Sequence, residues 1–322
     1  MPSGKFVISV VATTAFLFAA MVTASFAIHS PRTLGKVFTP NAVNTEEVIV
    51  DDFIPMAAET NEHVTEYPLD VDKLSLDSSK TFYRDHLDKH ARDAYDVLKA
   101  GLQSFEEEIE IPKDATKDEV KRILLSIAYD NPTMFWVLPS GTIVYYEQPM
   151  FRPDYTMSKD EAKELENQIA AIFDETAASI AEQAPYDRAL KRQMVVSWIA
   201  DRCAYDAEAP NGRNVLGVVF DGNAYCAGYA RTEVALLRLL GTPCVYVEGM
   251  AWSSGAETRH AWVLVVEGRE LTWDDPTWYD VDEDQLPVRY EEKWLASTWY
   301  DFADTHWAVD ASDIIEEEKP ES

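Results

Sequence analysis

Residues 260–278 read HAWVLVVEGRELTWDDPTW and predict a β-hairpin. Strand-like runs flank the Glu-Gly pair at 267–268, which we take as a two-residue turn. With that turn, His260 lies directly opposite Asp275. Opposed side chains on one face of a hairpin are roughly 5 Å apart at Cβ, which a hydrogen bond can bridge. The hairpin therefore predicts a histidine–carboxylate pair at its open end.

One face of this hairpin is more apolar than the other. With the turn at 267–268, that face carries His260 together with Trp262, Leu264, Val266, Leu271 and Trp273. We expect it to face the core. A slip of one residue in register would move one partner to the opposite face and break the His260–Asp275 pair.

The stretch at 222–241, GNAYCAGYARTEVALLRLLG, predicts a helix from Cys226 to Leu240 that Gly241 closes. Ala230, Val234, Leu237 and Leu240 form an apolar stripe at helical spacing. We expect this stripe to pack on the hairpin face that carries Trp262 and Trp273, with the helix start near His260. The positive field of a helix start lowers the pKa of a thiol.

Together these residues have the parts needed for acyl transfer through a thioester. Cys226 is the candidate nucleophile, His260 the base and Asp275 the acid that orients the imidazole. Backbone N–H groups at the helix start can receive an oxyanion. Each residue alone has an ordinary structural interpretation, as a buried cysteine, a core histidine and a turn-forming aspartate. The other candidate histidine, His306, has no facing carboxylate that the sequence predicts.

The motifs YCAGYA at 225–230, RHAWVLV at 259–265 and WDDPTWYD at 273–280 resemble the transglutaminase-like superfamily in order and spacing. The resemblance covers roughly residues 190–280. It implies an α+β fold with a papain-like core, in which a helix bearing the cysteine packs on an antiparallel sheet. It also implies Cys226, His260 and Asp275 as catalytic residues. Members often have Gln at position 227 and Asn at position 263, where this chain has Ala227 and Val263.

The superfamily includes cross-linking enzymes, peptidases, amidases and proteins without activity, so the resemblance leaves the reaction open. We expect a cysteine enzyme that forms a thioester with amides of a protein or cell-wall peptide, followed by transfer to an amine or by hydrolysis. The alternative is an inactive cell-surface binding or scaffold domain. Trp252, Tyr229, Trp278 and Tyr279 are either lining of an acyl tunnel or ordinary core residues.

The N-terminus indicates export. Lys5 precedes an uncharged run from Phe6 to Ile28, which is a signal peptide with cleavage after Ala27 or a membrane anchor. We therefore expect residues 1–27 to direct the chain out of the cytoplasm, as a secreted or membrane-anchored protein. Residues 28–77 are acidic with few large apolar residues, which predicts a flexible tether.

The rest of the chain divides into three regions in this interpretation. Residues 78–185 form a helix-rich N-terminal region, 186–315 the catalytic core, and 316–322 an acidic tail. Within the N-terminal region we expect helices at 78–105 and 116–130, a hairpin at 133–149 that turns at 139–141, and a long helix from Ser158 to Pro185, where a second helix follows. Helices first and an antiparallel sheet afterwards predict the α+β class.

Charge and motif content exclude several classes of protein. The formal charge of −29 repels nucleic acid and anionic lipid. The chain has no phosphate-binding loop or dinucleotide fingerprint and no His/Cys pair at zinc spacing, so we expect no cofactor and no metal. The stretch 280–292 matches an EF-hand at four positions but has Gln285 where glycine is required, so a solvated acidic loop is favoured. Cys203 and Cys244 either pair or remain buried free thiols.

Overall fold

The computed structural model describes residues 44–48, 74–253, 255–281 and 292–308, all of which belong to a compact unit that runs from Ala42 onward. The predicted signal or anchor, the EF-hand-like positions 282–291 and the acidic tail lie outside these residues. Among the described helices, none combines the length and the apolarity that a membrane crossing needs.

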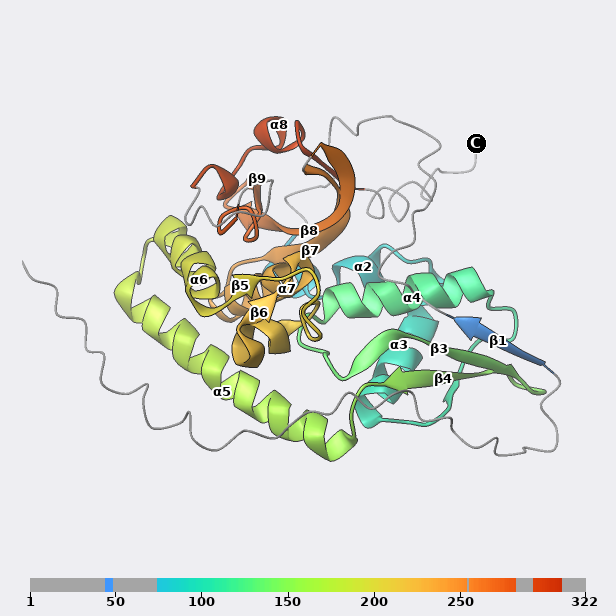
Figure 1. The fold of residues 1–322 in the computed structure, drawn as a ribbon. Coiled ribbons are helices and arrows are strands. Elements are labelled where there is room, and N and C mark those ends of the chain that lie inside the picture. The colour runs from blue at the N-terminus through green and yellow to red at the C-terminus, as the bar shows by residue number, and fades with distance from the viewer. Residues whose placement is uncertain (1–43, 49–73, 254, 282–291, 309–322) are drawn as a thin grey trace, which may run out of the picture. The chain divides into compact units, whose positions relative to one another are not determined.

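The first part of the chain combines helices with a four-stranded sheet (Figure 1). The sheet has the order β1-β3-β4-β2 and is antiparallel throughout. Its strands are β1 (Asn44–Val48), β2 (Ile109–Glu110), β3 (Val137–Tyr145) and β4 (Met150–Tyr155), and the helices are α1 (Leu76–Ser79), α2 (Phe82–Asp85), α3 (Lys89–Ser104) and α4 (Lys117–Asp130).

Two sequence predictions for this part are wrong in detail. Residues 44–48, predicted as part of a flexible tether, form a strand that pairs with β3 and buries Val48 completely. The single helix expected at 78–105 is interrupted between α2 and α3. The interruption occurs because the side chain of Asp88 accepts a hydrogen bond from the Ala91 N–H and so starts a new helix.

The predicted turn of the first hairpin is also wrong. Strand β3 continues through Pro139 and Gly141, and its register with β4 shifts between Val137 and Gly141. The chain reverses later, between Tyr145 and Met150. Proline donates no backbone hydrogen bond, so a local irregularity in a strand accommodates it as well as a turn does.

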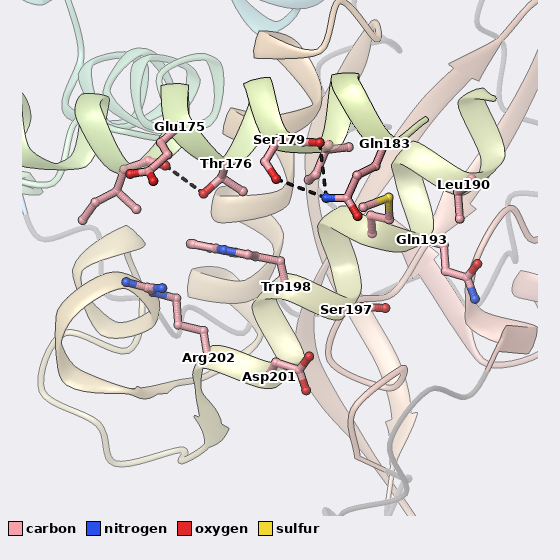
Figure 2. A pocket seen from close by; sticks show the side chains of 13 residues that line it. Glu175, Thr176, Ser179, Gln183, Leu190, Gln193, Ser197, Trp198, Asp201 and Arg202 are labelled. Atoms are coloured by element: carbon pink, nitrogen blue, oxygen red, sulfur yellow. Dashed lines mark hydrogen bonds between the residues drawn. The ribbon is translucent and has the colours of Figure 1, made fainter. Parts of the chain in front are cut away.

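A pair of helices, α5 (Lys159–Gln183) and α6 (Arg188–Arg202), connects the two sheets. Ser158 and Glu161 form a capping box at the start of α5, and Asp187 caps α6. The predicted long helix and its division near Pro185 are confirmed. A cavity of about 670 Å³ lies between the two helices, with Trp198 and Arg202 on its α6 side (Figure 2).

The second sheet contains the predicted hairpin. It is antiparallel and has the order β10-β7-β8-β9, with β7 (Cys244–Ser253), β8 (Ala256–Glu267), β9 (Glu270–Asp274) and β10 (His306–Ala308). The helix α7 (Cys226–Leu239) lies beside β7 and β8 (Figure 1). The short elements are β5 (Ala204–Tyr205), the π-helical turn η2 (Gly217–Asp221), β6 (Asn223–Ala224), the 3₁₀ turn η3 (Glu292–Trp294) and α8 (Trp299–Phe302). The predicted α+β class is confirmed.

The register of the hairpin differs from the prediction by two residues. In the predicted register Val263 faces Thr272, but in the structure it pairs with Asp274. The turn is Gly268-Arg269, with Gly268 at φ 69°. Glycine suits the first central position of such a turn, where φ is positive. Because the shift is even, each residue remains on the face predicted for it.

Helix α7 packs on the opposite face of the sheet from the one predicted. The Arg231 guanidinium lies 4.6 Å from the ring centroid of Tyr246, which pairs with Val263. On the other face, the ring of Phe302 lies 5.8 Å from the ring of Trp262. Both faces of β8 are buried, so its apolar pattern did not distinguish them.

Candidate active site

Cys226 is the first residue of α7, as predicted. The loop that contains Gly212 lies very close to this helix start. A side chain at position 228 would collide with the carbonyl oxygen of Gly212, so only glycine fits there. The Cys226 side chain is half-buried and borders a cavity of about 250 Å³ that His260 also borders. Cys203 and Cys244 are free and buried, which confirms one of the two alternatives predicted for them.

His260 lies between the cysteine and the carboxylate. Its Nε2 is 2.8 Å from Oδ2 of Asp275, and its side chain also hydrogen-bonds Cys226. Because Nε2 is engaged by Asp275, Nδ1 is the nitrogen left for the thiol. Burial lowers the pKa of His260, but the negative charge and hydrogen bond of Asp275 outweigh this effect and raise the pKa to about 10. His260 is therefore a cation at neutral pH in this arrangement.

Asp275 is completely buried just beyond the end of β9. Its Oδ1 accepts hydrogen bonds from the N–H groups of Thr277 and Trp278, at 2.9 and 3.1 Å. Burial raises the pKa of Asp275, but the charge of His260 and the hydrogen bonds lower it by more, so the net direction is downward. The carboxylate is thus held ionised and in one orientation.

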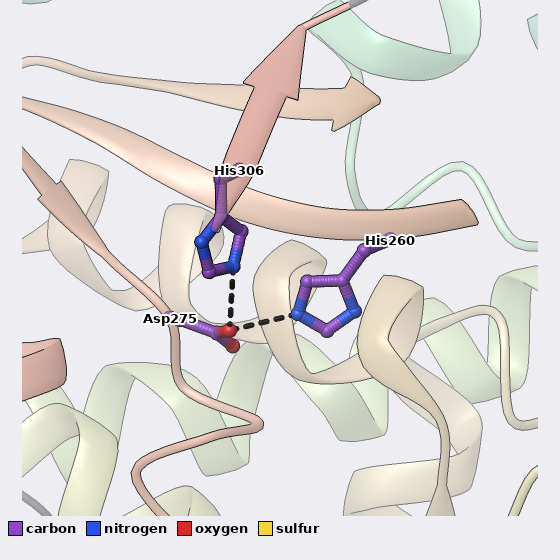
Figure 3. Close-up of side chains that lie close together, drawn as sticks. All are labelled: His260, Asp275 and His306. Atoms are coloured by element: carbon purple, nitrogen blue, oxygen red, sulfur yellow. Dashed lines mark hydrogen bonds and ion pairs between the residues drawn. The ribbon is translucent and has the colours of Figure 1, made fainter. Parts of the chain in front are cut away.

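His306 is the residue at this site that the sequence did not reveal. It is fully buried on β10, and its Nε2 lies 3.2 Å from the same Asp275 Oδ2 that binds His260 (Figure 3). Its Nδ1 lies 2.8 Å from the hydroxyl of Thr305. Burial lowers the pKa of His306 to about 4, so the ring is neutral at pH 7. A neutral ring donates from Nε2 to Asp275 and accepts from Thr305.

His260, Asp275 and His306 could together present three ligand atoms to a metal ion, since these atoms lie within 4.8 Å of one another. The hydrogen bonds already described account for the cluster. A metal at this point would compete for His260 Nε2, which binds the orienting carboxylate. The observed geometry therefore fits a hydrogen-bonded triad extended by a second histidine.

Behind the triad, a buried ion pair holds the end of β9. Asp274 accepts one hydrogen bond from Nε of Arg192, which lies on α6. It accepts a second hydrogen bond, of 2.7 Å, from the Ala296 N–H. Arg192 also donates to Thr272 at 2.7 Å. Glu233 of α7 is fully buried beside Asp274, and burial together with the charge of Asp274 raises its pKa well above the ordinary value. These contacts fix the backbone immediately before Asp275.

Part of the lining of the cavity beside Cys226 comes from the first part of the chain, before α5. Tyr129 of α4 and Pro139 of β3 line it, and the Tyr129 hydroxyl donates to Glu248 of β7 at 2.5 Å. The candidate tunnel residues Trp252, Tyr229, Trp278 and Tyr279 are not among the residues that line this cavity. The larger cavity between α5 and α6 has no cysteine or histidine in its lining.

Residues 174–283 match the family model of the transglutaminase-like superfamily. This part of the chain is therefore similar to transglutaminase-like domains. The match includes Cys226, His260 and Asp275, whereas His306 lies beyond it. A comparison with curated proteins returned no match.

The chain is also similar to several solved structures. One is a transglutaminase, 19% identical over 48% of each chain with a TM-score of 0.31. Another is a protein from Cytophaga hutchinsonii described as a cysteine protease, 16% identical over 44% of each chain with a TM-score of 0.30. A third is the periplasmic domain of TgpA from Pseudomonas aeruginosa, 20% identical over 36% of this chain and 45% of that chain, with a TM-score of 0.28. The chain spans less than half the length of each.

Two residues depart from the pattern often found in transglutaminase-like proteins. Ala227 lines the cavity next to Cys226, so its small side chain leaves room there. Val263 is buried on the face of β8 that α7 covers. The first departure therefore affects the cavity beside Cys226, and the second affects packing.

Proposed function

We propose that the chain is a cysteine enzyme that forms a thioester between Cys226 and the acyl group of an amide in a protein or cell-wall peptide. The observation that carries this proposal is the His260–Asp275 hydrogen bond of 2.8 Å, made by a histidine that shares a cavity and a hydrogen bond with Cys226. Nucleophile, base and orienting acid in this relation are the elements of thiol acyl transfer.

In the first step, the Cys226 sulfur attacks the amide carbonyl and an S–C bond forms. The proton that leaves the thiol resides on His260, which passes it to the amide nitrogen as the C–N bond breaks. Ammonia or an amine departs, and a thioester remains on Cys226. The N–H groups of Gly228 and Tyr229 donate to the Tyr225 carbonyl, so the N–H groups of Cys226 and Ala227, which precede them in α7, are the ones placed to receive the oxyanion.

In the second step, water or a primary amine attacks the thioester carbonyl while His260 accepts its proton. The S–C bond breaks, and the product leaves as a carboxylic acid or as a new amide. The sulfur leaves as a thiolate and the proton stays on His260, which restores the starting ion pair. Asp275 stays ionised throughout and keeps Nδ1 of His260 directed to the sulfur, because Nε2 is occupied by the carboxylate.

The cationic state of His260 supports this chemistry. A thiolate beside an imidazolium is the reactive form of a cysteine nucleophile. The rival proposal, an inactive binding or scaffold domain, does not require such a pair. The uncharged N-terminal run supports placing the enzyme outside the cytoplasm, secreted or membrane-anchored.

The proposal is tested by mass spectrometry of a glutamine peptide incubated with the full chain, with and without a primary amine. Replacement of the amide nitrogen by the added amine shows transfer, conversion of amide to acid shows deamidation, and fragments show proteolysis. Cys226→Ala should abolish every product. A Cys226→Ala variant as active as the parent protein would contradict the proposed nucleophile.

A further inference from the structure

His306 completes the hydrogen bonds around the Asp275 carboxylate. Resting on the proposed function, we infer that His306 is a positioning residue of the reaction: its Nε2–H holds Asp275 ionised and so keeps the proton of the His260–Asp275 pair on the imidazole. The residues that support the reaction then include β10, which lies beyond the family match at 174–283.

The hydrogen-bonding capacity of Asp275 is filled completely. A carboxylate has two oxygens, each of which accepts about two hydrogen bonds. Oδ1 of Asp275 accepts both of its bonds from the N–H groups of Thr277 and Trp278. Oδ2 accepts from Nε2 of His260 at 2.8 Å and from Nε2 of His306 at 3.2 Å. His306 therefore fills the one position that neither the backbone nor the base fills.

Aromatic side chains enclose the ring of His306. It stacks on the ring of Phe302, with centroids 3.9 Å apart and planes 22° apart. Three further rings pack against it in T-shaped contacts at centroid distances of 5.1, 4.5 and 5.5 Å, those of Trp262, Trp278 and Trp294. His306 is completely buried, so water does not compete with it as a donor to the carboxylate.

The neighbours of His306 fix which nitrogen donates. A carboxylate oxygen only accepts hydrogen bonds, so Nε2 of His306 carries a proton. Nδ1 lies 2.8 Å from the hydroxyl of Thr305. The backbone is held as well, because His306 pairs with Ala251 of β7 and the Trp252 N–H donates to the Thr305 carbonyl at 2.9 Å. The donor is therefore held in one orientation toward the carboxylate (Figure 3).

This donor influences where the proton of the buried pair resides. Imidazolium with carboxylate, and neutral imidazole with carboxylic acid, contain the same number of protons. Burial favours the neutral arrangement, whereas hydrogen bonds to the carboxylate favour the ionised one. Without His306, one acceptor position of Asp275 is empty and the pair shifts toward the neutral arrangement. His260 then has its proton on Nδ1, toward Cys226, and no longer stabilises a thiolate.

The test compares His306→Gln, which keeps an N–H donor, with His306→Leu, which has none. ¹⁵N NMR of histidine side chains in the full chain at pH 7 distinguishes an imidazolium from a neutral ring, and the His260 signals are assigned by their loss in His260→Gln. We expect His260 to be protonated on both nitrogens in the parent and in His306→Gln, but on one nitrogen in His306→Leu. An unchanged His260 signal in a folded His306→Leu would overturn the inference and leave the proposed function intact.

Alkylation of Cys226 by iodoacetamide at pH 6 measures the effect on the sulfur. We expect the rate to fall roughly tenfold in His306→Leu and to remain close to the parent rate in His306→Gln. Phe151→Leu is the matched control, because Phe151 is also completely buried but lies on β4 of the other sheet. A similar fall in both His306 variants, or in Phe151→Leu, would show that packing and not the donor is responsible, and would overturn the inference.

Two further measurements complete the test. On the glutamine peptide, His306→Leu should lower kcat and leave KM unchanged, because His306 is not among the residues that line the cavity beside Cys226; a change in KM alone would count against a positioning role. If His306→Leu does not fold, the parent spectrum decides, since His306 without a proton on Nε2 would overturn the inference. Absence of turnover in the parent would contradict the proposed function and leave the NMR result standing.

Discussion

Replacing Asp275 by Asn tests directly how the carboxylate orients His260. The Thr277 and Trp278 N–H groups require an acceptor at the Oδ1 position, so the Asn amide nitrogen takes the place of Oδ2. That nitrogen donates to Nε2 of His260, where the carboxylate accepted before. The histidine is then neutral and carries its proton on Nδ1, toward Cys226, and it cannot accept a proton from the thiol.

The structure gives the magnitude of this effect. Asp275 holds the pKa of His260 at about 10, compared with an ordinary 6.5. One unit in pKa corresponds to about 1.4 kcal/mol, so losing the carboxylate removes about 5 kcal/mol or more of imidazolium stabilisation. We expect kcat/KM on a glutamine peptide to fall by roughly a thousandfold or more.

The assay is the pH dependence of Cys226 alkylation by iodoacetamide, read by mass spectrometry. In the parent protein a cationic His260 should support labelling from pH 6 to about 10. In Asp275→Asn the rate at pH 6 should collapse and recover only as an ordinary thiol ionises, near pH 8.5. Asp130→Asn is the matched control. Asp130 is also buried and accepts several hydrogen bonds, including one of 3.0 Å from the Tyr95 hydroxyl. Labelling of Asp275→Asn within threefold of the parent rate at pH 6 would refute this reasoning.

Three further predictions concern other groups. At pH 6, iodoacetamide should modify Cys226 in preference to Cys203 and Cys244, because burial raises the pKa of each of these two thiols to about 12; peptide mapping showing equal modification would contradict this. Since the pKa of His306 is about 4 when folded and 6.5 ordinarily, the unfolded chain binds this proton first as the pH falls. The free energy of unfolding should therefore drop between pH 6.5 and 4, and His306→Asn should remove up to about 3 kcal/mol of that drop in urea titrations. Glu233→Gln should change the free energy of unfolding at pH 7 by less than about 1 kcal/mol, because burial and the charge of Asp274 raise the pKa of this carboxyl and so favour its neutral form; a loss above about 3 kcal/mol would show that its ionised form is required.

The hairpin shows what a sequence can and cannot predict. The turn was placed one residue too early, because the glycine was assigned to the second central position, and the strands therefore pair differently. The register differs from the predicted one by two residues, which is an even number. His260 and Asp275 therefore remain on the same face of the sheet. Alternation determines which face a side chain occupies, whereas register also depends on the turn, which carries a weaker signal.

The remaining differences come from contacts that local patterns do not encode. His306 reaches Asp275 because β10 pairs with β7, with His306 opposite Ala251, and a three-residue strand has too little alternation to predict its partner. The packing side of α7 was ambiguous because β8 is apolar on both faces. In contrast, the starts of α5 and α7 follow from capping and spacing within a few residues, and both were predicted correctly.

Tyr129 and Pro139 border the cavity from segments that lie upstream of residues 174–283. Part of the cavity lining therefore comes from outside the stretch of chain that contains Cys226, His260 and Asp275. Chains that share Cys226, His260 and Asp275 can differ in the shape of this cavity through changes in α4 and β3. Grafting those two elements from one member onto another is thus a route to exchanging their preferences without touching the chemistry.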